Sequence, residues 1–234
     1  MASTSEVTFG SKLQNAEKLL THLQSFKAYT PPISEQSPAN LQTLIAGIKQ
    51  QNNTTARSAQ GYSAAVDNRQ KLFQKDNDSL VKIMSPIAAT VRSAFGKSAK
   101  EATDIAGMVT RIRGKKLKKS GKSPDAESVS QSELSYGSIT QTFSDMIATL
   151  ENYGPGYKPA NDSIKLDVLN SKLLQLTAAN TGVTAAYGAL KQTRDDRIAL
   201  YKTLATLAQR IKDAVRSQYG NTSTEYVLVK GLKV

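Results

Sequence analysis

Seven cationic side chains and no acidic one occupy residues 111–122, RIRGKKLKKSGK. The 234-residue chain has a formal net charge of +12, so this single segment supplies most of the excess. Such a cluster can contact the phosphates of a nucleic acid or anionic lipid headgroups. The side chains that would make these contacts are Arg111, Arg113, Lys115, Lys116, Lys118, Lys119 and Lys122. The segment has no aromatic residue to stack on bases, and a solvated linker or a self-assembly contact explains the same composition.

Two acid–arginine pairs form a second candidate site. Asp67 and Arg69 recur as Asp195 and Arg197, and both arginines fall on the apolar register of a helical pattern. A charge at a core position must be paired or must extend to solvent. If two long helices pack antiparallel, Arg69 would meet the Asp195 region and Arg197 would meet Asp67. This arrangement predicts an inter-repeat salt-bridge cluster, with an anion-binding site as the alternative.

Two asparagines, Asn52 and Asn180, lie on the same apolar register. A core asparagine can fix the register of packed helices at some cost in stability, which is the interpretation we favour. A contact with a ligand is the alternative. We group both residues with the acid–arginine pairs as the candidate inter-repeat polar cluster.

Other chemistry finds little support in this sequence. The only histidine is His22, and there is no cysteine, which excludes thiolate metal sites, disulfides and paired-histidine metal motifs. The glycines are dispersed and form no phosphate-binding loop. We therefore expect no catalytic residue, no metal and no cofactor.

The chain repeats part of itself. VRSAFGKSAKE at 91–101 matches VRSQYGNTSTE at 215–225 with an offset of 124, and NRQKLFQ at 68–74 matches DRIALYK at 196–202 with an offset of 128. The change of offset places four extra residues, about one helical turn, near KDNDS in the first copy. The collinear matches predict an internal duplication. Chance similarity between two amphipathic helices is the alternative.

Each copy has the same predicted elements. A short amphipathic helix ends at a Tyr-x-Pro turn, at residues 29–31 and 157–159, and a much longer helical pattern follows. In the second copy a spacing of three and four residues continues from 166 to 218, which predicts one helix roughly 80 Å long. The alternative is that each long segment is broken, near Asn52 and Asn180 or near Asp76 and Asp195.

Glycine closes each long segment, at Gly96 and Gly220, where we expect a left-handed helix cap. The residues after Gly220, NTSTEYVLVKGLKV, alternate in a strand-like way. We therefore expect a short extended C-terminal tail, which could pair with a similar tail ending VTRIRGKK in the first copy.

The ending VRSQYGNTSTEYVLVKG resembles the C-terminal motif of some all-helical bacterial proteins of unknown function. The matching positions are Tyr219, Gly220, Ser223, Glu225, Tyr226 and Gly231. In that motif a long helix ends in Phe-Gly, and Glu-Tyr and a Gly-rich basic tail follow. The resemblance implies a helical fold, and it brings no activity and no functional residue with it.

These observations together predict an all-α protein: two tandem helical hairpins that form an elongated, coiled-coil-like four-helix bundle. The predicted division is a first repeat at 1–110, a basic linker at 111–129 and a second repeat at 130–234. The start, MASTSEVTFGSK, has no signal-peptide pattern, and no run approaches 18 apolar residues. We expect no membrane span and, by default, a cytoplasmic location.

The function that fits this composition and repeat is non-enzymatic. We expect a structural or protein-interaction protein, a subunit of a homo-oligomeric or filamentous assembly. Its partner would be a second copy or another protein. The alternative is polyanion binding, including nucleic acid, through residues 111–122.

Overall fold

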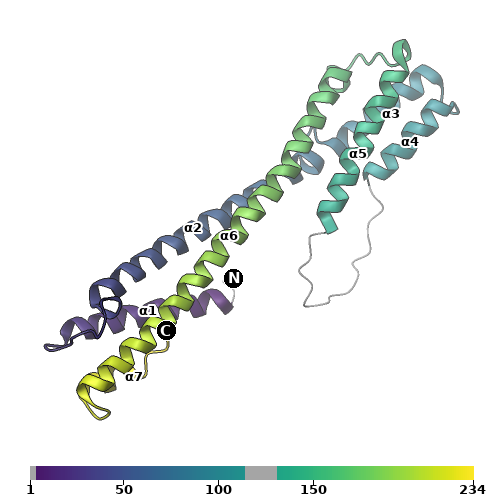
Figure 1. Ribbon diagram of the computed structural model, residues 1–234. Coiled ribbons are helices and arrows are strands. Elements are labelled where there is room, and N and C mark those ends of the chain that lie inside the picture. The colour runs from purple at the N-terminus through teal and green to yellow at the C-terminus, as the bar shows by residue number, and fades with distance from the viewer. Residues whose placement is uncertain (1–3, 114–130) are drawn as a thin grey trace. The chain divides into compact units, whose positions relative to one another are not determined.

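The computed structural model describes residues 4–113 and 131–234, with side chains from residues 9 and 136 onward in the two ranges (Figure 1). In these ranges every regular element is helical and no strand is present, which confirms the all-α prediction. The helices are α1 (Thr4–Ser25), α2 (Pro38–Gln70), α3 (Leu80–Phe95), α4 (Lys100–Arg113), α5 (Gln131–Asn152), α6 (Leu166–Tyr219) and α7 (Thr224–Lys230). None of them, within the described ranges, is both long and apolar enough to cross a lipid bilayer.

The two long segments differ in continuity. The second copy forms one helix of 54 residues, α6, as the unbroken spacing predicts. The first copy is interrupted: α2 passes into a π-helical turn, η2 (Lys71–Lys75), and a turn at Asp76–Ser79 leads into α3. Continuity therefore fails for the first copy, where the alternative of a break near Asp76 is the one observed. Four inserted residues explain the break, because they widen one turn to π geometry and leave the remainder outside the helix.

The chain forms two compact units. Unit 1 consists of Met1–Gln60 and Gly188–Val234, and unit 2 consists of Gly61–Tyr187. Unit 1 thus combines α1 and most of α2 with the last part of α6 and α7. Unit 2 combines the end of α2, α3 and α4 with α5 and the first part of α6. Each unit therefore joins the beginning of one copy to the end of the other.

The cores of the two units use corresponding residues. Before the insertion the sequence offset is 127 or 128, and after it the offset is 124. The corresponding buried pairs are Ala16 with Phe143, Leu19 with Met146, Leu23 with Leu150, Leu41 with Leu169, Ile48 with Leu176, Tyr201 with Phe73, Leu204 with Leu80, Ile211 with Ile87, Val215 with Val91 and Val229 with Ile105. Chance similarity of helical periodicity does not produce such paired cores, so they support the inferred duplication.

The Tyr-x-Pro turns have a defined role in both units. The Tyr157 hydroxyl donates to the carbonyl oxygen of Ile164 at 2.8 Å, and the Tyr29 hydroxyl donates to that of Gln36 at 3.1 Å. These carbonyls belong to short 3-10 helices, η4 (Asp162–Ile164) and η1 (Ser34–Gln36), that precede the long helices. Burial raises the pKa of Tyr157 to about 12, so its hydroxyl remains a donor at neutral pH.

The predicted extended tails are wrong, because residues 109–113 of the first and residues 224–230 of the second are helical. Residues 224–230 form α7, and the corresponding part of the first copy forms α4. The Ser223 side chain accepts a hydrogen bond from the Tyr226 amide and caps α7, and Val229 is fully buried. Alternation over so few residues fits either structure, and the N-cap together with packing of one face selects the helix.

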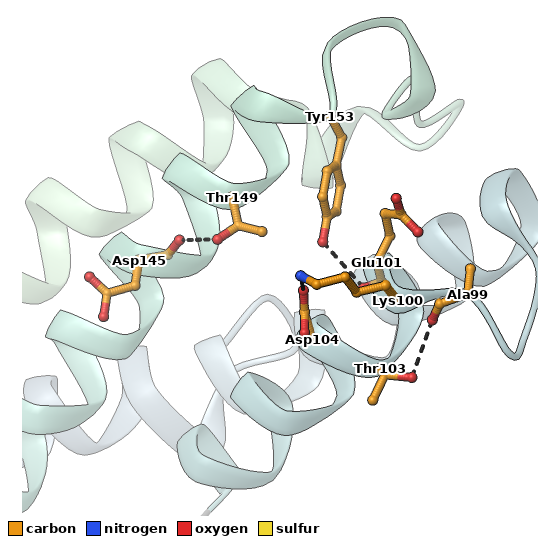
Figure 2. A network of polar contacts seen from close by, with 8 residues as sticks. All are labelled: Ala99, Lys100, Glu101, Thr103, Asp104, Asp145, Thr149 and Tyr153. Atoms are coloured by element: carbon orange, nitrogen blue, oxygen red, sulfur yellow. Dashed lines mark hydrogen bonds and ion pairs between the residues drawn. The ribbon is translucent and has the colours of Figure 1, made fainter.

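Polar contacts join α4 to the residue that follows α5 in unit 2 (Figure 2). The Tyr153 hydroxyl donates to the carbonyl oxygen of Glu101 at 3.3 Å, and Lys100 forms an ion pair with Asp104 at 2.7 Å. Burial and then the nearby acids Asp104 and Glu101 raise the pKa of Tyr153. Unit 1 has Phe26 at the position corresponding to Tyr153, so this hydroxyl contact is specific to unit 2.

The glycines that end the long segments have positive φ angles, 94° at Gly96 and 92° at Gly220. At Gly96 ψ is 155°, so its backbone lies in a region that is essentially restricted to glycine, and not in the left-handed helical region that we expected. Its amide still closes α3 by donating to the carbonyl oxygen of Arg92 at 3.0 Å.

We predict that Gly96→Ala lowers the free energy of unfolding by about 1–3 kcal/mol, because any Cβ strains this backbone. The matched control is Gly107→Ala in α4, where an added Cβ has no neighbour within 4 Å and φ is helical. That control should be neutral or stabilising by about 0.5–1 kcal/mol. Urea unfolding of both variants measures the two changes in the free energy of unfolding. Equal changes would contradict the inference that the backbone of Gly96 is restricted to glycine.

Candidate functional site

A buried arginine in unit 2 stacks on an aromatic ring. Arg69 is only 4% exposed, and its guanidinium carbon lies 4.2 Å from the centre of the Tyr136 ring. Phe73 packs edge-on against the same ring, with centroids 4.7 Å apart. The stack shields the charged group from water and compensates part of the desolvation cost by cation–π attraction.

Unit 1 repeats this stack at the corresponding positions. Arg197 is 7% exposed, and its guanidinium carbon lies 4.6 Å from the centre of the Phe9 ring. Phe9 in turn packs against Tyr201, with centroids 4.5 Å apart. The order of ring types is reversed relative to unit 2: the arginine covers a phenylalanine here and a tyrosine there.

The two core asparagines lie beside these stacks, and each finds a different acceptor. Asn52 donates through its side-chain amide to the Tyr201 hydroxyl at 3.1 Å. Asn180 donates to the Thr140 hydroxyl at 3.1 Å, because the residue corresponding to Tyr201 is Phe73, which has no hydroxyl. In both asparagines the amide oxygen is buried and has no hydrogen-bond partner within the described ranges.

Small pockets adjoin both polar clusters. In unit 2 a pocket of about 270 Å³ is lined by Arg69, Gly137, Asn180, Thr181 and Thr184. In unit 1 the corresponding pocket has a volume of about 370 Å³. It is bordered by Gly10, Asn52 and Arg197, which correspond to Gly137, Asn180 and Arg69, and by a second arginine, Arg194.

Of the two acids in the predicted cluster, Asp67 pairs with lysines close to it in the sequence and Asp195 is exposed. Asp67 forms ion pairs with Lys71 at 2.8 Å and Lys75 at 3.0 Å, and the hydrogen bonds from these lysines lower its pKa. Arg69 and Asp67 belong to unit 2, whereas Arg197 and Asp195 belong to unit 1. Each predicted pair therefore involves residues of different units, and these pairings remain predictions.

The basic segment begins inside a helix. Arg111 and Arg113 form the exposed last turn of α4, where cations are favourable, and the Arg113 guanidinium donates to the Ser85 hydroxyl. The other candidate contacts lie outside the described residues: Lys115, Lys116, Lys118, Lys119 and Lys122. The first three residues of the predicted linker, 111–113, are helical.

Sequence reasoning missed one ion pair that the insertion creates. Lys172 of α6, whose side chain is 8% exposed, contacts Asp78 of the inserted turn at 2.6 Å. The residue of unit 1 that corresponds to Lys172 is Leu44, which borders a surface groove of about 600 Å³, and the inserted Asp78 has no counterpart there. Comparing the two copies residue by residue would have shown a lysine, Lys172, where the other copy has an apolar leucine, and an inserted segment that carries acids.

No group of three or more metal-binding side chains occurs within the part of the chain that the structure describes. Comparisons with protein-family models, with curated proteins and with solved structures find no match to this chain.

The Lys172–Asp78 pair gives a prediction about stability. Asp78→Asn should lower the free energy of unfolding by about 1–3 kcal/mol, because it leaves a buried ammonium group without its counter-charge. Lys172→Leu, which copies the residue of the other unit, should change it by less than about 1 kcal/mol. Denaturant unfolding at neutral pH measures both changes.

The same pair predicts a dependence on pH. The hydrogen bond from Lys172 lowers the pKa of Asp78, so the contribution of the pair is complete above the ordinary carboxyl pKa and is lost as the pH falls through the lowered value. Lys172→Leu should flatten this acid limb relative to the parent protein. An unchanged acid limb in Lys172→Leu would show that the pair contributes nothing.

Proposed function

We propose that this protein is a non-enzymatic structural or protein-interaction protein that associates with further copies of itself. The observation that carries the proposal is an uncharged, exposed face of α6. Residues 173–190 contain no charged side chain, although much of that stretch is exposed. We call the exposed residues of α6 from Leu174 to Tyr187, together with residues 61–64 of α2, the uncharged surface.

Apolar anchors occur on this surface. Leu174 is 72% exposed and Tyr187 is 50% exposed, the two highest values among the large exposed hydrophobic residues of the described chain. Tyr187 packs against Tyr62 of α2, with ring centroids 5.7 Å apart. Depletion of charge and enrichment of aromatic side chains distinguish interface cores from ordinary protein surface.

The distribution of charge allows a second copy as the occupant. Two molecules with a net charge of +12 repel each other, so they associate best over a region that adds no like charge. Between the anchors the exposed residues are small or uncharged: Gln175, Thr177, Ala178, Thr181, Gly182, Thr184 and Ala185. Small side chains let another helix approach closely and bury more of the Leu174 side chain.

The proposal includes the origin of the fold. We infer that one helical hairpin was duplicated and that the two copies then exchanged their second halves. Corresponding core residues and the mixed composition of both units support this history. On this interpretation each unit is a coiled-coil-like bundle assembled from tandem hairpins, and the monomer offers two related sets of surfaces.

Replacing Leu174 with glutamate tests the proposal. The parent protein should form larger species as its concentration rises, as measured by size-exclusion chromatography with light scattering and by electron microscopy. Leu174→Glu should weaken this association at least about tenfold, because it places an unpaired charge in the interface.

The matched control is Leu228→Glu, which introduces the same charge at an exposed leucine of α7 in unit 1. It should associate as the parent does. A parent protein that stays monomeric at high concentration would exclude self-association, and equal effects of both variants would exclude the uncharged surface as its location.

A second candidate function, polyanion binding, is favoured by the seven cations of residues 111–122. Binding through these side chains would be electrostatic and independent of sequence. The logarithm of its affinity for duplex DNA should fall with the logarithm of salt concentration, with a slope of about −0.9 per phosphate contacted.

Replacement of Lys115, Lys116, Lys118 and Lys119 by alanine should remove most of this binding, measured by gel retention of duplex DNA and single-stranded RNA across a salt series. A control with the same net charge replaces the exposed lysines Lys18, Lys27, Lys97 and Lys191 by alanine. Equal losses in the two variants would indicate a general charge effect and would contradict a specific role of the segment.

A further inference from the structure

We propose that the pocket beside Arg69 in unit 2 is a binding site for a small oxyanion that also carries a proton, of the class of hydrogen phosphate. Two buried polar atoms in this pocket lack a hydrogen-bond partner among the described residues. Arg69 is 4% exposed, and its Nε atom has no hydrogen-bond partner among the described residues. The amide oxygen of Asn180 is likewise buried and without a partner there. Both residues line the same pocket of about 270 Å³.

The arginine sets the charge of the ligand. No salt bridge joins Arg69 to a carboxylate whose side chain the structure describes, and the Tyr136 ring compensates only part of its desolvation. A buried charge left with an unused N–H donor favours an anionic acceptor strongly, because charge-assisted hydrogen bonds are about twice as strong as neutral ones. The planar guanidinium group suits a carboxylate or a phosphate.

The asparagine sets the protonation of the ligand. Its amide nitrogen already donates to Thr140, which fixes the orientation of the amide and leaves the oxygen as an unused acceptor. An acceptor needs a donor, so a fully deprotonated anion would satisfy Arg69 and leave Asn180 unpaired. Hydrogen phosphate has both an anionic oxygen and a P–OH group, whereas sulfate at neutral pH has no proton to donate.

The pocket walls fit a small ligand. Thr181 and Thr184 line its rim, and their hydroxyls donate to the carbonyl oxygens of Thr177 and Asn180. Gly137 leaves one wall open, since an added Cβ there would have no neighbour within 4 Å. The corresponding pocket of unit 1 also has a glycine, Gly10, and an asparagine with an unpartnered amide oxygen, Asn52. A glycine and an asparagine with an unpartnered amide oxygen therefore recur at corresponding positions of the two pockets.

Calorimetric titration of the full chain with inorganic phosphate, and with sulfate at matched ionic strength, tests the site. Phosphate should bind saturably and at least about tenfold more tightly than sulfate, which cannot donate to Asn180. Equal binding of the two anions, or no saturable binding of phosphate, would overturn the proposal. The latter result is also the one expected if a water molecule bridges the two atoms.

Three variants locate the binding. Arg69→Met should abolish it, with circular dichroism as the check on folding. Gly137→Val extends a side chain from one wall of the pocket, leaves Arg69 in place and should weaken phosphate binding at least about tenfold. Its matched control is Gly107→Val in α4, an equally open helical glycine, which should bind phosphate as the parent does.

The basic segment is a competing phosphate site, and the quadruple lysine variant separates the two. Replacement of Lys115, Lys116, Lys118 and Lys119 by alanine should leave the saturable binding intact. If that variant loses it, or if Gly137→Val binds phosphate as tightly as the parent, the pocket is not the site. Neither result bears on self-association, which Leu174→Glu tests separately.

Discussion

The burial of both ends of one continuous helix is the constraint on which the rest of this structure depends. The first part of α6 supplies Leu169 and Leu176 to the core of unit 2, and its last part supplies Leu204 and Ile211 to the core of unit 1. A single helix cannot bury so long an apolar stripe on itself, so each part requires partners from the other repeat. Each unit is completed by the other copy's elements, and neither repeat contains a whole core of its own.

The four-residue insertion shows how the two copies diverged while this constraint held. It breaks the first long segment at η2, yet the apolar positions on both sides stay in place: Phe73 corresponds to Tyr201, and Leu80 corresponds to Leu204. An insertion of about one helical turn restores the register after the break, which a different length would not do. The displaced turn then provides Asp78, and Lys172 replaces the leucine of the other copy.

Much of this was accessible from the sequence, and the limits have a physical cause. Periodicity located α6, because it depends on the spacing of apolar residues. The change of offset between the two copies located the insertion, and the backbone preference of glycine at helix ends located Gly96 and Gly220. The sequence did not predict that each unit combines parts of both repeats. An apolar helix face indicates burial, but it does not indicate which of two similar faces, one from each repeat, packs against it. Helix α7 was misassigned because its VLV alternation is short and its Ser223 cap was not recognised. At the candidate site the register marked Arg69 and Asn180 as core residues, but nothing in it indicated the aromatic ring beneath the arginine.

The two polar clusters have changed in a compensated way, which explains why buried polar groups persist in both. In unit 1 the amide of Asn52 has the Tyr201 hydroxyl as its acceptor, and position 13 is an apolar leucine. In unit 2 the corresponding ring is Phe73, and Thr140 stands at the position of Leu13 and supplies the missing acceptor. Loss of one hydroxyl is thus matched by gain of another at a neighbouring position, because a buried amide donor without an acceptor is costly. Replacing the asparagines by apolar residues would have removed the need for either acceptor, so their retention beside a stacked arginine indicates that the polar cluster itself is maintained.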